Sequence, residues 1–232
     1  MKTTLLAFTL NEIDAVQVIM PQIDREWVDE ILVVDGGSTD GTIEYLKEND
    51  YKVIIQSEKG FPAAYREGVE NAIGDVIITF SPDGNSIPSL IPNLVNKMRE
   101  GYDMVIVSRY LDGAVSEDDD VVTAFGNWMF TKMINILFGG RYTDTLVVYR
   151  AWKREVIELL SYDETVGGVD PHLSIVAAKH KLNVSEIPGD EPKRIGGVRK
   201  MQPFRNGLGI LRLIAKELFQ SKSVKKGNLI KS

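Results

Sequence analysis

The chain has 232 residues, enough for one large α/β domain or for one domain with a short appendage. Hydrophobic residues make up 44% of it and charged residues 26%, which is ordinary for a soluble globular protein. The absence of cysteine excludes a disulfide framework, a thiolate metal site and a cysteine nucleophile, and it fits the cytosol. No run of eighteen apolar residues occurs, so no transmembrane helix is expected. The first ten residues lack a small-residue cleavage site, which favours a buried strand over a signal peptide.

The net charge of −6 is unevenly distributed along the chain. From Lys193 to the end there are eleven basic residues and one acid, Glu217, whereas the preceding residues carry a net charge of −16. A basic C-terminal segment on an acidic body indicates an anionic partner, such as a phosphate or a lipid surface. A tail folded back on the acidic domain has the same composition, so both interpretations stay open.

Hydrophobic periodicity predicts strands that alternate with helices. The predicted strands are 3–9, 30–34, 51–56, 76–80 and 103–107, and the helices among them are 14–23, 42–49, 63–72 and 88–100. After an acidic loop at 116–120, the pattern predicts helix 122–138, strand 142–151, helix 171–179, strand 182–187, a loop at 189–203 and helix 204–220. This alternation predicts an α/β fold, with a mostly parallel central sheet and helices on both faces.

Asp35 stands at the end of a predicted buried strand, directly after four apolar residues. Ligands of open α/β sheets bind at this edge, where an acid can accept hydrogen bonds from a nucleobase or a ribose. Gly36 and Gly37 would let the backbone approach such a ligand. Ser38 or Thr39 can cap the following helix. A plain strand-to-helix turn is the alternative, and spacing alone does not decide between the two.

Several short segments form a recognisable series along the chain. They are Asn11-Glu12, 33–42 (VVDGGSTDGT), 60–68 (GFPAAYREG), 74–77 (GDVI), 107–110 (VSRY), 144–145 with 149–150 (DT and YR), and 194–200 (RIGGVRK). In this order they resemble the family 2 glycosyltransferases of the GT-A fold, over residues 3–202. The last segment resembles the basic loop of the polyprenyl-phosphate branch, which includes the dolichol-phosphate mannosyltransferases. The resemblance implies a nucleotide-sugar donor site that includes Asn11, Glu12, Asp35, Gly37, Ser38, Gly60 and Arg109.

The family's Asp-X-Asp motif, which holds a divalent cation against the donor diphosphate, falls on Ser81-Pro82-Asp83. A serine therefore replaces the first carboxylate. Asp83 remains, and Asn85 stands where the polyprenyl branch often places an amide ligand. The resemblance implies Mg²⁺ or Mn²⁺ bound by Asp83 and Asn85 together with phosphate oxygens, which gives Asp83 a catalytic role. The alternative is that residues 83–85 form only a turn.

Asp170 matches the acid that the family assigns as general base. An inverting transfer to a sugar hydroxyl needs a base, because the nucleophile must lose its proton as it attacks. A phosphate acceptor is already anionic, and Asp170 would then only orient the acceptor or the donor sugar. Asp170 followed by Pro171 is also a good N-cap and N1 pair, and the two roles are compatible.

Arg194, Arg199 and Lys200 bracket a Gly-Gly pair in a segment rich in glycine, proline and charge. Their side chains suit phosphate contacts, so they could close over the donor diphosphate or hold a lipid phosphate. A solvated basic loop is the alternative.

The last predicted helix is amphipathic and basic. Its apolar residues at helical spacing are Phe204, Leu208, Leu211, Ile214 and Leu218, and its basic residues are Arg205, Arg212 and Lys216. The pattern fits a helix in a membrane interface, and it fits a helix packed on the domain. We favour peripheral contact with the membrane.

These observations predict a GT-A domain over residues 1–203, followed by an amphipathic helix and basic tail over residues 204–232. The expected activity is transfer of a sugar from a nucleotide-diphosphate donor to polyprenyl phosphate, with inversion, on the cytoplasmic side of a membrane. The alternatives are a sugar-to-glycan transferase of the same fold and a catalytically silent relative that binds nucleotide sugars. A nucleotidyltransferase or a dinucleotide oxidoreductase would need a glycine-rich loop after the first strand, where this chain has TLNE. No nucleic-acid partner is expected.

Overall fold

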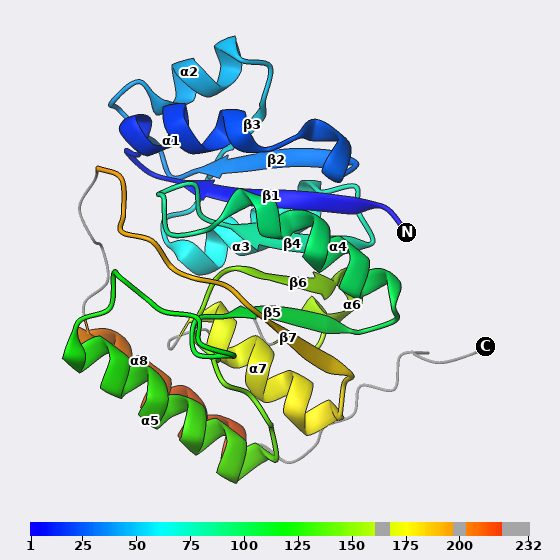
Figure 1. Cartoon of the computed structure of the whole chain (residues 1–232), viewed down its shortest axis with the longest axis vertical. Coiled ribbons are helices and arrows are strands. Elements are labelled where there is room, and N and C mark those ends of the chain that lie inside the picture. Colours follow the sequence, from blue (N-terminus) through cyan, green and yellow to red (C-terminus); the bar gives the residue numbers. More distant parts are fainter. Residues whose placement is uncertain (161–167, 197–202, 220–232) are drawn as a thin grey trace.

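The computed structural model describes residues 1–160, 168–196 and 203–219. It contains a seven-stranded sheet of order β3-β2-β1-β4-β6-β5-β7 (Figure 1). The strands are β1 (Thr3–Thr9), β2 (Glu30–Asp35), β3 (Lys52–Ile55), β4 (Val76–Phe80), β5 (Met104–Ser108), β6 (Arg150–Lys153) and β7 (Val184–Pro188). All neighbours pair in parallel except β6, which runs antiparallel to both β4 and β5. The predicted mostly parallel sheet is therefore confirmed.

Eight α-helices and three 3₁₀ helices connect these strands in the described part of the chain. The α-helices are α1 (Ile13–Ile19), α2 (Thr42–Glu48), α3 (Phe61–Asn71), α4 (Ile91–Arg99), α5 (Val121–Phe138), α6 (Arg154–Ile157), α7 (Val169–His180) and α8 (Pro203–Phe219). The 3₁₀ helices are η1 (Met20–Gln22), η2 (Arg25–Trp27) and η3 (Pro88–Leu90). Local signals fix the ends of α5: the Asp120 side chain accepts a hydrogen bond from Thr123 N at 2.7 Å, and Gly139 ends the helix with φ +80°.

Side chains of the central strands alternate between two hydrophobic cores, one on each face of the sheet. On β1, Leu5 and Ala7 pack with residues of α1, α2 and α4, whereas Leu6 and Phe8 pack with residues of α3, α5, α6, α7 and α8. Because both faces are covered, β1, β4 and β5 are buried along their whole length, whereas the edge strands β3 and β7 are mostly only half-buried or exposed. The carboxyl ends of the parallel strands remain as the open edge of the sheet.

The predicted strand over 142–151 is wrong for most of its length, since only its last two residues belong to β6. Side chains bind the first backbone groups of the preceding loop, and a neighbouring strand reaches it only at its last residue, where Val107 N donates to Tyr149 O at 3.1 Å. The Asn135 side chain exchanges two hydrogen bonds with the backbone of Tyr142, at 2.8 and 3.0 Å. The Glu186 carboxylate accepts hydrogen bonds from the backbone N–H groups of Thr143 and Asp144. Pairing with β4 and β5 begins only at Arg150.

The helix α8 packs on α5 and α7 and contributes Ile210, Leu213 and Ile214 to the second core. Glu217 anchors it by accepting a hydrogen bond from His172 at 3.1 Å and one from Lys179 at 2.6 Å. These two partners lower the pKa of Glu217 to about 2. The C-terminal helix therefore shares the core of the domain, while other apolar side chains on it stay exposed.

Among the described residues, α5 alone has the length and composition of a membrane-crossing helix, with a mean hydropathy of 1.2 over 18 residues. We expected no such helix, because polar residues interrupt its apolar run, whereas mean hydropathy averages over them. Helices of soluble proteins meet the same criterion, so one helix of this kind is weak evidence for a membrane span.

Candidate functional site

A cavity of about 1200 Å³ opens at the carboxyl ends of β1, β2, β4 and β5. Seven of the predicted site residues line it: Glu12, Gly60, Asp83, Asn85, Arg109, Asp170 and Arg194. Four others, Asn11, Asp35, Gly37 and Ser38, lie in the loops around it but are not part of its wall. Arg199 and Lys200 lie outside the described residues. The fold thus brings residues from both ends of the chain to one place.

The carboxylate of Asp35 is fully buried and organises the turn after β2. One oxygen accepts hydrogen bonds from the backbone N–H groups of Gly37 and Ser38, at 2.8 and 2.7 Å. The other accepts from the hydroxyls of Thr9 and Ser38, both at 2.7 Å. Asn11 N in turn donates to Ser38 Oγ at 2.8 Å, which ties the first loop to this turn. In this structure Asp35 fixes the turn beside the cavity, and its direct contact with a nucleoside stays a prediction.

The predicted cap of α2 is wrong. Neither Ser38 nor Thr39 caps this helix, because its N-cap position is Gly41; the preceding Asp40 carboxylate accepts hydrogen bonds from both the backbone N–H and the hydroxyl of Thr42. The Thr42 hydroxyl also accepts a hydrogen bond from Glu12 N at 3.1 Å. Ser38 is thereby left to join Asp35 and the first loop.

Asp83 and Asn85, in the turn after β4, each offer a side-chain oxygen that could bind a cation. Asn85 N donates to Asp83 Oδ1 at 3.0 Å, so the predicted turn is present as well. The Asn85 amide N–H₂ donates to Pro192 O at 3.0 Å, which fixes the orientation of the side chain. Asn85 Oδ1 is buried and has no hydrogen-bond partner among the described residues. A buried acceptor without a partner beside a carboxylate fits a cation ligand.

The described residues contain no group of three or more His, Cys, Asp or Glu side chains that could hold a metal ion. Ser81, which replaces the family's first carboxylate, also lines the cavity. A cation at Asp83 and Asn85 would therefore take its remaining oxygen ligands from a bound diphosphate and water.

Asp170 belongs to the first turn of α7, because the N-cap position is Gly168. The prediction that Asp170 caps the helix is therefore wrong. Tyr65 donates its hydroxyl to Asp170 Oδ1 at 2.6 Å, and Arg150 Nε lies 3.5 Å from the same oxygen. Burial raises the pKa of Asp170, although Arg150 and Tyr65 act in the opposite direction. Tyr65 was not among the predicted site residues, since it lies 105 residues from its partner in the sequence.

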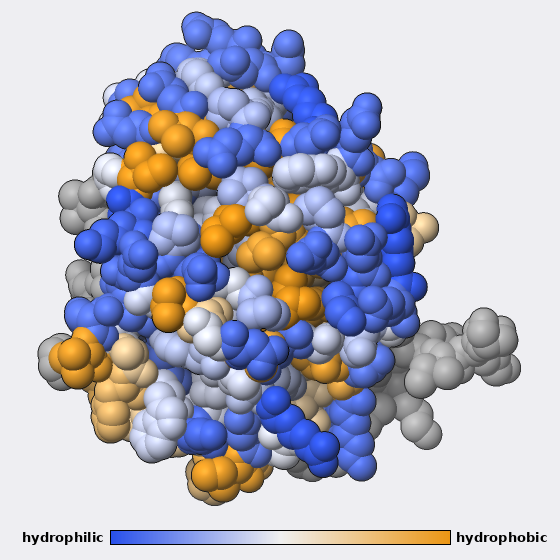
Figure 2. Space-filling view, viewed as in Figure 1, coloured by the Kyte–Doolittle hydropathy of each residue, from blue (hydrophilic) through white to orange (hydrophobic). Residues whose placement is uncertain are grey.

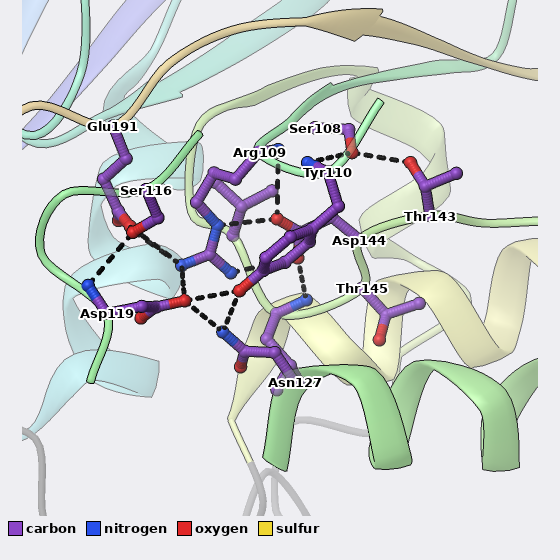
Figure 3. A network of polar contacts seen from close by, with 12 residues as sticks. Ser108, Arg109, Tyr110, Ser116, Asp119, Asn127, Thr143, Asp144, Thr145 and Glu191 are labelled. Carbon is purple, nitrogen blue, oxygen red and sulfur yellow. Dashed lines mark hydrogen bonds and ion pairs between the residues drawn. The ribbon is translucent and has the colours of Figure 1, made fainter. Parts of the chain in front are cut away.

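Arg109 lies in a buried cluster of carboxylates at the end of β5 (Figure 3). Its guanidinium bonds to Asp144 at 2.6 and 3.1 Å and to Glu191 at 3.2 Å, and lies 3.8 Å from Asp119. Burial acts to lower the pKa of Arg109, but its anionic neighbours, Asp144 first and then Glu191, together hold that pKa well above its ordinary value. The cluster joins β5 to the loop before α5 and to the segment after β7. A contact between Arg109 and a donor stays a prediction.

Known proteins are similar to this chain in sequence and in fold. The model of the family described as Glycosyl transferase family 2 matches residues 22–160. The chain is 29% identical over 210 residues to the dolichyl-phosphate hexose transferase of Haloferax volcanii, covering 90% of each chain. It is 28% identical over 208 residues to glycosyltransferase AglJ of the same organism, covering 88% of this chain and 67% of that relative.

A solved structure of glucosyl-3-phosphoglycerate synthase from Mycobacterium tuberculosis, with Mn²⁺, UDP and phosphoglyceric acid, superposes with a TM-score of 0.71. It is 20% identical to this protein and covers 96% of this chain and 80% of its own. The structural likeness shows the GT-A fold. The family match covers more than half of the chain, and the protein therefore belongs to family 2 of the glycosyltransferases.

Proposed function

We propose that this protein transfers a sugar from a nucleotide-diphosphate sugar to polyprenyl phosphate, with inversion at the anomeric carbon. The observation that carries the proposal is the composition of the cavity. One part of its wall is polar and charged, with Glu12, Asp83, Asn85 and Arg194, and another part is apolar, with side chains of α5 and α8. A lipid phosphate has the same two-part character. The relative named as a dolichyl-phosphate hexose transferase supports this acceptor.

The polar part suits the donor diphosphate and the cation. Asp83 and Asn85 would hold Mg²⁺ or Mn²⁺, which would neutralise charge on the leaving nucleoside diphosphate. Arg194 offers a guanidinium for phosphate oxygens. The loops of Asn11, Asp35 and Ser38 would shape the nucleoside end, and Gly60, the N-cap residue of α3, also lines the cavity.

Asp170 would face the reacting sugar and the acceptor. A phosphate acceptor arrives as an anion, so its attack does not require a general base. Burial raises the pKa of Asp170, so this carboxyl keeps its proton to a higher pH than an exposed aspartate. Burial thus shifts Asp170 toward the neutral carboxyl, which repels an anionic phosphate less than a carboxylate does. Its predicted role is therefore to orient the acceptor.

The apolar part of the cavity lies where α5 and α8 pack together. Its wall includes Phe125, Met129, Phe130, Leu208 and Leu211. An isoprenoid chain placed here would bury apolar surface against these side chains, which is favourable by ~25 cal/mol per Å². The acceptor phosphate at the end of that chain would point toward Asp170.

The exposed apolar side chains of α5 and α8, some of which also line the cavity, would contact the membrane that supplies this lipid. Hydrophobic residues gather over α5 at the lower left of the molecule (Figure 2). The exposed apolar side chains of the two helices include Val121, Val122, Phe125, Trp128, Leu208, Leu211, Leu218 and Phe219. Exposed Lys132, Arg205, Arg212 and Lys216 flank them, and the one acid on these helices, Glu217, is buried. An apolar surface with basic flanks suits the interface of an anionic membrane, on the cytoplasmic side in our proposal.

A donor screen tests the function. The full chain is incubated with UDP-, GDP- and dTDP-sugars, with and without Mn²⁺ and with and without polyprenyl phosphate in vesicles, and lipid-linked sugar is measured. The proposal predicts metal-dependent sugar transfer to the lipid phosphate with at least one donor. Transfer to a soluble glycan instead would assign the sugar-to-glycan activity, and binding without transfer would indicate a silent relative.

A further inference from the structure

The segment that follows β7 packs against the turn formed by Asp83, Gly84 and Asn85, which is the proposed cation site. Ile195 N donates to Asp83 O at 2.8 Å, and Pro192 O accepts from the Asn85 amide. Gly84 has φ +96°, and a Cβ at this position would lie 2.8 Å from Ile195 Cγ1. The turn and the segment therefore pack too closely for any side chain at position 84.

This packing places the Arg194 guanidinium directly on Asp83. Arg194 Nη2 lies 2.8 Å from Asp83 Oδ2, and Nη1 lies 3.3 Å from Glu12 Oε1. The carboxyl side chains are only 9% and 6% exposed, so solvent screens these pairs little. Asp83 Oδ1 accepts from Asn85 N, so Arg194 holds the other carboxylate oxygen.

A divalent cation at Asp83 would meet this guanidinium. Two positive groups on one carboxylate repel each other, and burial strengthens that repulsion. Because Ser81 replaces the first carboxylate of the metal motif, the cation has no second motif carboxylate that it could bind instead of Asp83. A bound diphosphate would relieve this repulsion, since its oxygens can bind both the guanidinium and the metal.

We infer that Arg194 is an exchangeable occupant of the cation position: it binds Asp83 in the donor-free protein and moves to the diphosphate when donor and cation enter together. The inference rests on the proposed donor site. It makes Arg194 a positioning residue that delays cation binding until a donor is present. Arg194 Nε is buried without a hydrogen-bond partner among the described residues, so this side chain keeps a donor for a phosphate oxygen.

Mn²⁺ binding without nucleotide is the direct test, measured on the full chain by electron paramagnetic resonance of free Mn²⁺. Arg194→Gln should bind Mn²⁺ about tenfold more tightly than wild type, equivalent to ~1.4 kcal/mol. Arg194→Lys, which keeps the charge, should fall between the two. Arg99→Gln removes an exposed guanidinium from α4 and should match wild type. Asp83→Asn combined with Arg194→Gln should lose the gain.

The second readout is binding of UDP and GDP in EDTA, which should be about tenfold weaker in Arg194→Gln for whichever nucleotide wild type binds. Tighter Mn²⁺ binding together with weaker nucleotide binding by Arg194→Gln would support the exchange. Equal or weaker Mn²⁺ binding by Arg194→Gln, with an unchanged melting temperature, would overturn it. A gain in Mn²⁺ affinity without any sugar transfer by wild type would leave the exchange standing and remove the proposed function.

Discussion

Replacing Tyr65 by Phe tests whether the Tyr65–Asp170 contact sets the chemistry of the site. The substitution removes the hydroxyl that donates to Asp170 at 2.6 Å and keeps the aromatic ring. That ring packs against Phe8 and Phe61, with centroid distances of 4.7 and 5.1 Å, so the packing is expected to survive. A hydrogen bond to a charged group contributes ~1.5–3 kcal/mol, and one pKa unit corresponds to ~1.36 kcal/mol. The loss of this bond should therefore destabilise the carboxylate of Asp170 by ~1.5–3 kcal/mol and raise the pKa of Asp170.

The assay is the pH dependence of kcat/KM for sugar transfer. The Tyr65 hydroxyl stabilises the carboxylate, so its removal must move the ionisation of Asp170 upward in pH. The limb of the profile that reports Asp170 should shift to higher pH in Tyr65→Phe. Tyr51→Phe is the control, since the Tyr51 hydroxyl donates to the carbonyl of Met20, away from the cavity. Superimposable profiles for Tyr65→Phe and wild type, with an intact fold, would refute the reasoning.

Three further predictions concern the turn, the C-terminal helix and the outer surface. Gly84→Ala adds a steric clash to a left-handed backbone, whereas Gly101→Ala, at φ +97° with no atom within 4 Å, adds only the backbone strain. Gly84→Ala should therefore lower the free energy of unfolding by ~1–3 kcal/mol more, measured by urea denaturation. Glu217→Gln should lower stability by ~1–3 kcal/mol at pH 7, with the difference shrinking as pH falls from 4.5 toward 2 in thermal melts. The double variant Phe125→Ser, Trp128→Ser should bind anionic vesicles about tenfold more weakly in a sedimentation assay, without a lower melting temperature.

Each of these predictions has an outcome that contradicts it. Equal losses in the free energy of unfolding for Gly84→Ala and Gly101→Ala would mean that residues 194 and 195 move away from the added Cβ at little energetic cost. The sign for Glu217 follows from its lowered pKa: its stabilisation is complete above the unfolded pKa and disappears as pH falls through the folded pKa. A constant Glu217→Gln deficit down to pH 2 would exclude this linkage. Unchanged vesicle binding by the double serine variant would remove α5 from the membrane surface.

Sequence patterns predicted most elements of the fold because periodicity is a local property. The strands from Thr3–Thr9 to Met104–Ser108 and their intervening helices follow apolar runs that the sequence displays directly. The antiparallel insertion of β6 between β4 and β5 has no local signal. Its pairing partners are distant in the chain, and the loop before it is fixed by the side chains of Asn135 and Glu186.

The candidate site could be predicted residue by residue only where motifs carry it. Asp83, Asn85 and Asp170 were identified in this way, and they share one cavity. Contacts across the chain could not be foreseen, because spacing does not report which loops meet. The Tyr65–Asp170 hydrogen bond and the Arg194–Asp83 ion pair are of this kind, since their partners are separated by 105 and 111 positions in the sequence.

The most direct test of the proposed function is mass spectrometry of lipid extracted after incubation with donor, Mn²⁺ and vesicles that contain polyprenyl phosphate. Wild type should form a sugar-linked polyprenyl phosphate, and Asp83→Ala or addition of EDTA should abolish it. Equal product from Asp83→Ala would contradict the cation site. Sugar transfer that proceeds equally well in vesicles without polyprenyl phosphate would contradict the proposed acceptor.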